Sequence, residues 1–194
     1  MLEAEIKASL SGLSMETLLE QAGSMGFRPA AQLRETDMYF NGNDRDFRRT
    51  DEALRLRRVQ ALPDGTEESL LTYKGPKLDR VSSARTEYET AVADGETAGN
   101  LLEALGYRPV FTVEKLRREY RLDDVTLCLD EVTGLGAYLE LETLAPSEED
   151  REAAVNRLLT LLDRLGVSRD RLTRHSYLEL LAARGGAGRE HGTN

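Results

Sequence analysis

The sequence predicts a single α+β domain in which an antiparallel β-sheet closes into a barrel and helices pack on its outside. Three observations support this fold class. Strand-like alternation dominates up to about residue 145, charged residues collect on one side of that alternation, and a strand–helix–glycine unit occurs three times. Residues 1–184 are predicted to form the domain, and the Gly-rich segment 185–194 is predicted to be a disordered tail.

Period-2 alternation separates apolar from charged side chains in each predicted strand. At residues 2–8, Glu3, Glu5 and Lys7 alternate with apolar residues. The segment at 126–132 is mixed, because Cys128, Asp130 and Val132 share a side. The other segments place the following side chains together on one side: Arg55 with Arg57, Thr72 with Lys74, Arg85 with Glu87 and Glu89, Lys115 with Arg117, and Glu140 with Glu142.

The charged side of any one strand is explained by the solvated face of an antiparallel sheet. Its recurrence is less easily explained in this way, because like charges in cross-strand register repel by up to about 1 kcal/mol per pair. In a closed barrel these side chains would point inward, where buried charges must be paired. The pattern therefore favours an interior that holds opposite charges, a metal ion or a polyanion.

The repeated unit supports closure of the barrel with helices outside. In each copy a Glu-x-Glu strand is followed by an amphipathic helix and then a glycine, and the helices are expected near 14–25, 98–105 and 147–165. The residues expected as N-caps are Ser14, Thr97 and Ser147. The glycines expected as left-handed C-caps are Gly26, Gly106 and Gly166. The apolar stripes expected to cover the sheet are Leu18, Leu19 and Ala22; Leu101, Leu102 and Leu105; and Leu158, Leu161, Leu162 and Leu165.

Composition limits the classes of function. A net charge of -9 argues against extended nucleic-acid contact, but not against a small anionic ligand, because local and net charge are separate. No apolar run approaches the ~20 residues that span a bilayer, and the N-terminus lacks the features of a signal peptide. The single Cys128 excludes an internal disulfide and indicates a cytoplasmic protein. Two His and one Cys cannot form a Cys/His zinc site, so a bound metal would be a hard cation on carboxylates, Mg²⁺ or Mn²⁺.

Taken in order, these charged motifs resemble the CYTH family of triphosphate-tunnel enzymes over nearly the whole chain. The most specific motif is the opening Glu3-x-Glu5-x-Lys7, and ALRLRR, TYKGPK, RTEYE, VEKLRREY, LDEVTGLG and LELE follow in the family's order. DFRRTDEALRLRR, LTYKGPKLD, GLGAYLELE and SYLELL resemble the class IV adenylyl cyclase branch more than the thiamine triphosphatase branch. Ala137-Tyr138 departs from that branch, where a Phe is expected.

The resemblance implies an eight-stranded antiparallel tunnel that binds a triphosphate with Mg²⁺ or Mn²⁺. The implied catalytic residues are Glu3, Glu5, Lys7 and Glu142. The implied triphosphate ligands are Lys7, Arg55, Arg57, Lys74, Arg85, Lys115 and Arg117. The implied metal ligands are Glu3, Glu5, Asp130, Glu140 and Glu142, with Glu87 in a supporting role. Two alternatives stay open: Arg85 and Glu87 form a structural ion pair, and Asp130 positions an arginine.

The implied activity is that of an adenylyl cyclase that converts ATP to cyclic AMP and pyrophosphate. A triphosphatase that hydrolyses tripolyphosphate or thiamine triphosphate is the alternative, because both reactions use the same cations and carboxylates. A non-catalytic module that binds a phosphorylated ligand is a third reading, against which the number of converging Glu residues argues. The expected partner is a small-molecule triphosphate, with no nucleic acid and no membrane, and a homodimer is left open.

Overall fold

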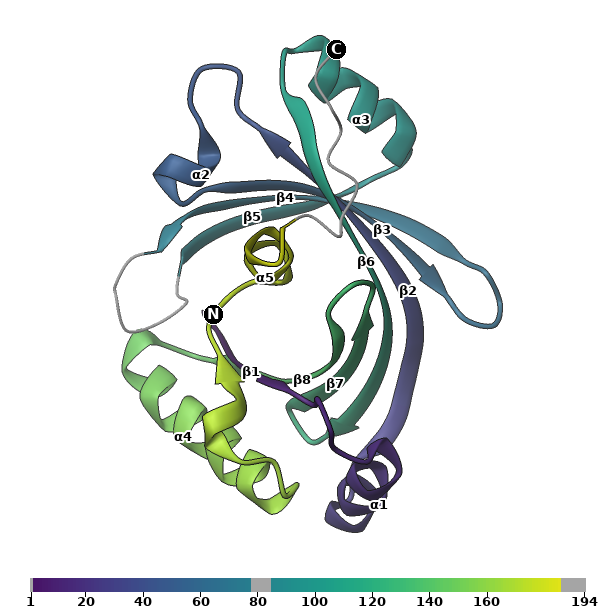
Figure 1. Cartoon of the computed structure of the whole chain (residues 1–194), viewed down its shortest axis with the longest axis vertical. Helices are drawn as coiled ribbons and strands as arrows, with labels where there is room; N and C mark the ends of the chain where they lie inside the picture. Colours follow the sequence, from purple (N-terminus) through teal and green to yellow (C-terminus); the bar gives the residue numbers. More distant parts are fainter. Residues whose placement is uncertain (1, 78–84, 186–194) are drawn as a thin grey trace. The chain divides into compact units, whose positions relative to one another are not determined.

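The computed structural model describes residues 2–77 and 85–185 (Figure 1). Within these residues the elements are, in order, β1 (Leu2–Ser9), α1 (Met15–Met25), β2 (Arg28–Asn41), α2 (Phe47–Thr50), β3 (Ala53–Ala61), β4 (Glu67–Lys77), β5 (Arg85–Val92), α3 (Gly95–Ala104), β6 (Arg108–Leu122), β7 (Val125–Val132), β8 (Gly136–Ala145), α4 (Glu148–Arg164), the 3₁₀ helix η1 (Arg169–Arg171), β9 (Leu172–Thr173) and α5 (Tyr177–Ala183).

The described strands form one sheet in the order β5-β4-β3-β2-β6-β7-β8-β1-β9. The pairings of β1 with β8 and β9, of β2 with β3, of β3 with β4, of β4 with β5 and of β7 with β8 are antiparallel. The predicted α+β class is therefore confirmed, and the described residues include eight longer strands and the two-residue β9. Closure of the sheet into a barrel stays a prediction.

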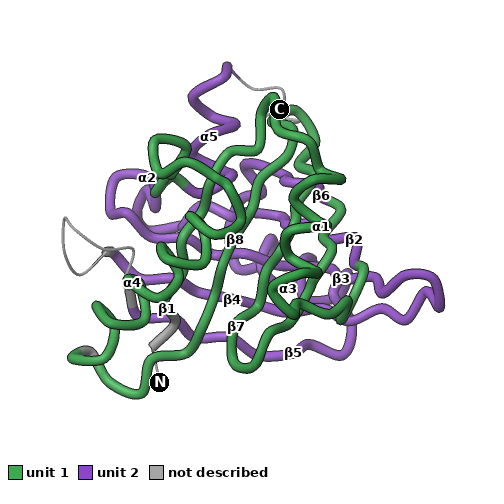
Figure 2. The backbone as a smooth tube through the Cα atoms, turned by 90° about the horizontal axis from the view of Figure 1, so that it is seen from below, with its two compact units in different colours: residues 1–32, 116–175 green, residues 33–115, 176–194 purple. Residues whose placement is uncertain are grey.

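The chain divides into two compact units, coloured separately in Figure 2. Unit 1 comprises residues 1–32 and 116–175, and unit 2 comprises residues 33–115 and 176–194. β2 and β6 each contribute residues to both units. The domain boundary at residue 184 stays a prediction, and the predicted tail lies, apart from Gly185, outside the described residues.

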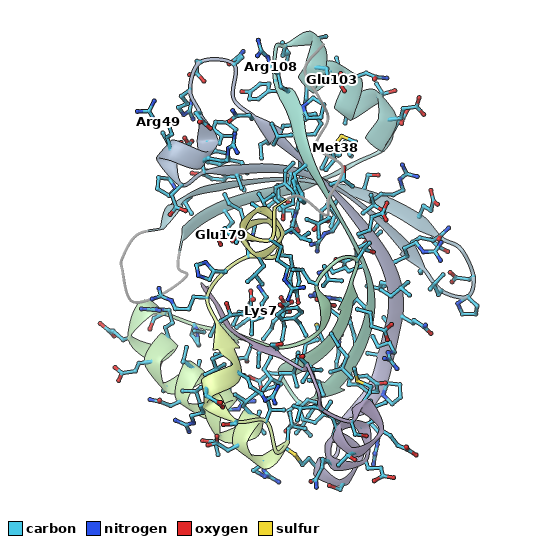
Figure 3. The ribbon with its side chains drawn as sticks, viewed as in Figure 1. Lys7, Met38, Arg49, Glu103, Arg108 and Glu179 are labelled. Atoms are coloured by element: carbon cyan, nitrogen blue, oxygen red, sulfur yellow. The ribbon has the colours of Figure 1, made fainter. Side chains whose placement is uncertain are left out.

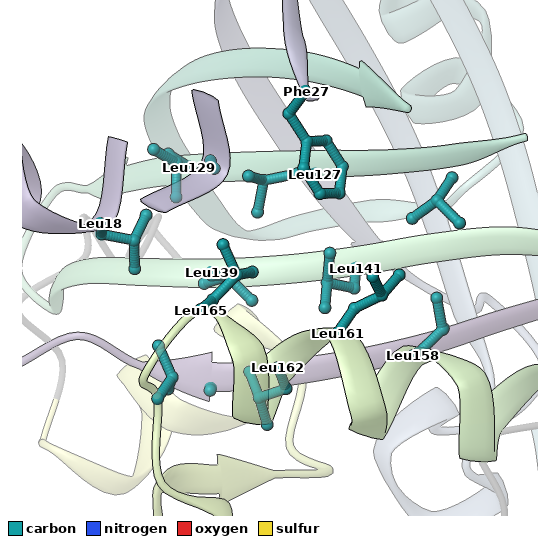
Figure 4. Close-up of a cluster of buried hydrophobic side chains, with 14 of the residues drawn as sticks. Leu18, Phe27, Leu127, Leu129, Leu139, Leu141, Leu158, Leu161, Leu162 and Leu165 are labelled. Carbon is teal, nitrogen blue, oxygen red and sulfur yellow. The ribbon is translucent and has the colours of Figure 1, made fainter. Parts of the chain in front are cut away.

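The apolar core of unit 1 lies between the strands and two helices, α1 and α4 (Figure 4). Period-2 alternation directs one face of β7 and β8 to this core, and the helices present the leucine stripes expected from the sequence. The labelled side chains of the cluster are Leu18, Phe27, Leu127, Leu129, Leu139, Leu141, Leu158, Leu161, Leu162 and Leu165. The apolar side of the predicted alternation is confirmed for β1, β7 and β8.

Leu139→Ala is expected to destabilise the protein by about 2–5 kcal/mol, because it leaves a cavity in this core. Leu139 is 0% exposed, whereas Leu144 on the same strand is 57% exposed. Leu144→Ala is therefore the matched control, with an expected change within about 0.5 kcal/mol. Urea unfolding of both variants measures the difference, and equal losses would contradict this placement of the core.

The apolar core of unit 2 contains buried side chains from β2, α2 and β3, namely Phe40, Phe47, Leu54 and Leu56. Met38, labelled in Figure 3, and Leu102 of α3 pack against them. The stripe predicted on α3 is wrong at two positions, since Leu101 is 59% and Leu105 is 64% exposed. Ala98, Gly99 and Leu102 occupy the side of α3 that contacts the strands, so the other two leucines are turned toward water.

Two of the three predicted helix caps are confirmed, because the side chains of Ser14 and Ser147 accept hydrogen bonds from the first turns of α1 and α4. The third is wrong. Asp94 caps α3 by accepting from the backbone N–H groups of Glu96 and Thr97 and, at 2.6 Å, from the Thr97 hydroxyl. A carboxylate with two acceptor oxygens satisfies three donors here, so the helix begins earlier than the sequence indicated.

The glycines that follow α1, α3 and α4 adopt the left-handed conformation that was predicted for them. Their φ values are 102° at Gly26, 92° at Gly106 and 74° at Gly166. A side chain at Gly106 would also approach Asn43, whose amide donates to the carbonyl of Leu105 at 2.7 Å. Among the described residues, none of the helices combines the length and apolar character needed to cross a membrane.

Candidate functional site

Each unit carries charged side chains on the sheet face opposite its apolar core. We define the unit 1 charged face by Glu5, Lys7, Arg117, Asp130, Glu140 and Glu142. We define the unit 2 charged face by Glu35, Asp37, Arg55, Arg57, Thr72, Lys74, Glu87, Glu89 and Lys115.

On the unit 1 charged face, the pairing of β1 with β8 sets Glu5 opposite Glu142 and Lys7 opposite Glu140. The Nζ atom of Lys7, labelled in Figure 3, lies 3.1 Å from Glu140 Oε1 and 3.4 Å from Glu5 Oε1. Burial disfavours the charged ammonium, but the negative charges of Glu140 and Glu5 outweigh it and raise the pKa of Lys7. Lys7 is therefore held in its cationic form beside two carboxylates.

Arg117 of β6 links three strands of this face. Its Nε and Nη2 atoms donate to the two oxygens of Asp130 at 2.7 and 2.6 Å, and Nη2 also contacts Glu140. Burial opposes the charge of Arg117, but hydrogen bonds to Asp130 and the charge of Glu140 raise its pKa. Asp130 is fully buried and acts as the partner of an arginine, which is one of its two predicted roles. Its role as a metal ligand stays a prediction.

The described side chains of the unit 1 charged face include four carboxylates and two basic groups, so negative charge is in excess. Glu5 and Glu142, which carry the same charge, stand at directly opposite register positions, where they repel unless a cation lies near them. The Nη1 atom of Arg117 lies 3.6 Å from Glu142 Oε1. Glu3 is on β1 with Glu5 and stands opposite Leu144, and its side chain lies outside the described part of the structure.

Carboxylate oxygens are the donors that Mg²⁺ and Mn²⁺ prefer, so the chemistry of this face fits the predicted hard cation. Among the described residues, no three acidic, His or Cys side chains stand together as a preformed metal site. Glu5, Glu140 and Glu142 are instead directed toward Lys7 and Arg117. Ligation of a metal by these residues and Glu3 stays a prediction.

On the unit 2 charged face, Arg57 of β3 is held by two carboxylates of β2. Its Nε and Nη2 atoms donate to Asp37 at 2.6 and 2.7 Å, and its Nη1 atom lies 3.1 Å from Glu35 Oε2. Burial opposes the charge of Asp37, but the hydrogen bonds and charge of Arg57, with further charge from Arg55 and Lys115, lower its pKa. Burial likewise opposes the charge of Arg57, and Asp37 and Glu35 raise its pKa.

Lys115 of β6 belongs to the same face. Its Nζ atom is 3.0 Å from Glu35 Oε2 and 5.2 Å from the ring centroid of Tyr177, the first residue of α5. A cation over the face of a tyrosine ring is attracted by the ring quadrupole. The C-terminal helix of unit 2 therefore contacts a predicted triphosphate ligand directly, a contact that the SYLELL motif alone did not indicate.

Arg55 is held more loosely than Arg57. Its Nη2 atom donates to Thr72 Oγ1 at 3.2 Å and to Glu89 Oε2 at 3.4 Å, and its Nη1 atom lies 3.8 Å from Asp37. Its Nε atom is buried and has no hydrogen-bond partner. A buried donor without a partner costs about 1–3 kcal/mol, which is the kind of cost that functional sites retain.

Lys74 and Glu87 form the exposed end of the unit 2 charged face. The Nζ atom of Lys74 lies 2.7 Å from Glu87 Oε1, and the two residues are opposite each other in the pairing of β4 with β5. Glu87 thus supports a predicted triphosphate ligand. The predicted ion pair between Glu87 and Arg85 stays a prediction, because the side chain of Arg85 lies outside the described part of the structure.

Sequence reasoning missed the contribution of β2. Glu35, Asp37 and Tyr39 lie on the charged side of this strand, whereas Met38 and Phe40 lie in the unit 2 core. The sequence signal is weak here, because Arg34 and Thr36, which are polar, stand on the side opposite Glu35 and Asp37, so the alternation of apolar and charged residues is incomplete. Burial, with the charge of Asp37, raises the pKa of Tyr39, so its phenol stays protonated.

Cys128 lies next to Arg117 in the unit 1 structure but does not act as a nucleophile there. Its side chain is fully buried, and burial is the main reason that the pKa of its thiol is raised. Because the thiolate is the reactive form, a cysteine in this setting packs and does not react.

The chain matches the CYTH domain over residues 1–177. It is 37% identical over 180 residues to "Putative adenylate cyclase MJ0240" of Methanocaldococcus jannaschii, covering 93% of this chain and 98% of that protein. It is 27% identical over 172 residues to "Adenylate cyclase CyaB" of Aeromonas hydrophila, covering 89% of this chain and 79% of that protein.

Solved structures show the same likeness. The PH1819 protein of Pyrococcus horikoshii superposes with a TM-score of 0.83 at 37% identity, over 94% of this chain and 99% of that one. The structure "Putative adenylyl cyclase HpAC1 from Hippeastrum reveals a dominant triphophatase activity" shares the fold with a TM-score of 0.63 at 18% identity, over 94% of this chain and 95% of that one. By its match to the domain and its 37% identical relative, the chain belongs to the CYTH family.

Proposed function

We propose that this protein is a metal-dependent enzyme that acts on a triphosphate, and that it converts ATP to cyclic AMP and pyrophosphate. The observation that carries the proposal is the pairing of buried basic side chains with carboxylates on both charged faces. Lys7, Arg117, Arg57 and Lys115 each form an ion pair with a buried carboxylate in this way. The cyclase names of two relatives, one of them 37% identical, favour this reaction over other triphosphate chemistry.

In the proposed reaction, the 3′-hydroxyl oxygen of ATP forms a bond to the α-phosphorus, and the bond from that phosphorus to the bridging oxygen breaks. Pyrophosphate leaves, and the hydroxyl proton is released. Basic side chains of the charged faces bind the phosphate oxygens through charge-assisted hydrogen bonds and stabilise the negative charge that develops on the leaving group. Arginine is suited to this task because its planar group can bind two phosphate oxygens at once.

Glu3, Glu5, Glu140 and Glu142 are the residues that would hold Mg²⁺ or Mn²⁺, with Asp130 as a further candidate. A bound divalent ion would neutralise phosphate charge and orient the triphosphate. Lys7 and Arg117 form ion pairs with Glu5, Glu140 and Glu142 and offset part of their negative charge. Without these two cations the neighbouring carboxylates would repel one another more strongly.

A triphosphatase is the second candidate. The Hippeastrum structure, which has a dominant triphosphatase activity, shares the fold alone at 18% identity, and one fold can host several activities. The same basic residues would bind tripolyphosphate or thiamine triphosphate, with water attacking the terminal phosphorus in place of the ribose hydroxyl.

Product analysis tests the proposal and separates the candidates. The purified protein is incubated with ATP, thiamine triphosphate or tripolyphosphate, each with Mg²⁺ or Mn²⁺. Cyclic AMP with pyrophosphate from ATP is the expected result. Orthophosphate without cyclic AMP would establish the triphosphatase instead. An increase in melting temperature with tripolyphosphate, but no product from any substrate, would indicate a binding module and overturn the catalytic proposal.

A further inference from the structure

Asp37 is the most tightly engaged carboxylate of the unit 2 charged face, although it belongs to neither predicted ligand set. It is 3% exposed, and both of its oxygens accept hydrogen bonds from one guanidinium, at 2.6 and 2.7 Å. It also stands directly opposite Arg57 in the pairing of β2 with β3, so the contact is fixed by the register of the sheet. A two-point contact of this kind sets the plane of the guanidinium as well as its position.

The two arginines of β3 differ in this respect. Arg55 and Arg57 are two residues apart and therefore point to the same face. Only Arg57 has the two-point contact; the nearest approach of Arg55 to Asp37 is 3.8 Å, through Nη1. An arginine carries five donor hydrogens, so the two hydrogen bonds of Arg57 to Asp37 leave the other N–H groups in a fixed direction.

We infer that Asp37 is a positioning residue for Arg57, which it orients so that the remaining N–H groups can bind a phosphate group. The inference rests on the proposed function, in which this face binds a triphosphate. Asp37 does not touch the substrate and acts through Arg57. The negative charge of Asp37 also repels an anion directly. If Asp37 positions Arg57, its removal should weaken the binding of a phosphate group; if it only balances charge, its removal should strengthen that binding.

The test is a double-mutant cycle in which the dissociation constant for tripolyphosphate is measured by calorimetry. Asp37→Asn is expected to weaken binding by about tenfold in the wild-type background and by less than about threefold in the Arg57→Lys background. In the Arg55→Lys background the full tenfold effect is expected to persist. Glu67→Gln, which removes an exposed carboxylate bonded to Gln60 on the same sheet, is the control and is expected to change nothing.

Other outcomes overturn the inference. Tighter binding by Asp37→Asn would mean that Asp37 only balances charge. Equal effects in all three backgrounds would mean that it only supports folding, which a lower melting temperature would accompany. If Asp37→Asn does not fold, Asp37→Glu takes its place: it keeps the charge but moves the carboxylate, so weaker binding supports positioning and unchanged binding overturns it.

Turnover of ATP and tripolyphosphate by the wild-type protein is measured in parallel, which keeps the two proposals apart. Binding that shows the expected coupling without any turnover would sink the proposed function and leave the inference standing. Turnover with additive effects would sink the inference alone. A wild-type protein that does not bind tripolyphosphate and converts neither ATP nor tripolyphosphate would overturn both.

Discussion

Glu142→Gln is expected to lower turnover of the triphosphate substrate by at least about a hundredfold while leaving the protein folded. The substitution keeps the shape of the side chain but removes one charge from the proposed metal ligands. Glu142 is 21% exposed in its side chain and lies 3.6 Å from Arg117, so its removal is expected to cost at most about 1 kcal/mol of stability. Product formation with Mg²⁺ or Mn²⁺ and the melting temperature are the two measurements.

Glu131→Gln is the matched control for this prediction. Glu131 lies on β7, its side chain is 56% exposed, and it pairs with Arg118 at 2.8 Å away from the charged face. Its substitution removes the same charge from the same unit and is expected to leave turnover unchanged. Wild-type rates from both Glu142→Gln and Glu5→Gln would show that neither residue contributes to the metal site.

Arg117→Met is expected to destabilise the protein by about 3–5 kcal/mol, because it leaves buried carboxylates without their cation. The side chain of Arg117 is 8% exposed, and its partners Asp130 and Glu140 are 0% and 6% exposed. The cost arises from the uncompensated charges, and the loss of the methylene chain is largely offset by methionine. Urea unfolding monitored by circular dichroism gives the change in the free energy of unfolding.

The neighbouring Arg118 offers a close comparison. It also pairs with an acidic residue of β7, Glu131, at 2.8 Å, but its side chain is 31% exposed. Arg118→Met is therefore expected to cost less than about 1 kcal/mol, as exposed pairs usually do. Similar losses from the two substitutions would contradict the burial argument.

Much of the sheet could be predicted because alternation is a local property. A strand places successive side chains on opposite faces whatever it pairs with, so Leu139 and Leu141 could be separated from Glu140 and Glu142 by sequence alone. The helices were also predictable from local signals, since Ser14 and Ser147 and the glycines that end the helices act within one turn. The errors at Thr97 and Leu101 have a local cause: a nearby alternative residue, Asp94 or Ala98, satisfies the same requirement better.

The candidate site was predictable in its residue types but not in its pairings. Asp130 had two predicted roles, and its contact with Arg117 was decided by the packing of β6 beside β7. Glu35 and Asp37 are two residues apart and therefore share a face, but their importance depends on β3, which brings Arg57 into register with Asp37. Nothing in the sequence indicated that the Nε atom of Arg55 would be buried without a hydrogen-bond partner.

The sequence by itself thus determined the family, seven of the eight longer strands and three of the helices that the structure describes, and which side chains of those strands share a face, because alternation and capping depend on residues close together in the chain. Only the tertiary structure decided which charges meet. Glu5 stands opposite Glu142, and Lys7 opposite Glu140, because two strands from distant parts of the chain pair in one register. A shift by one residue would move these side chains to the other face, so the register of the sheet, and not the composition of its strands, sets the electrostatics of the site.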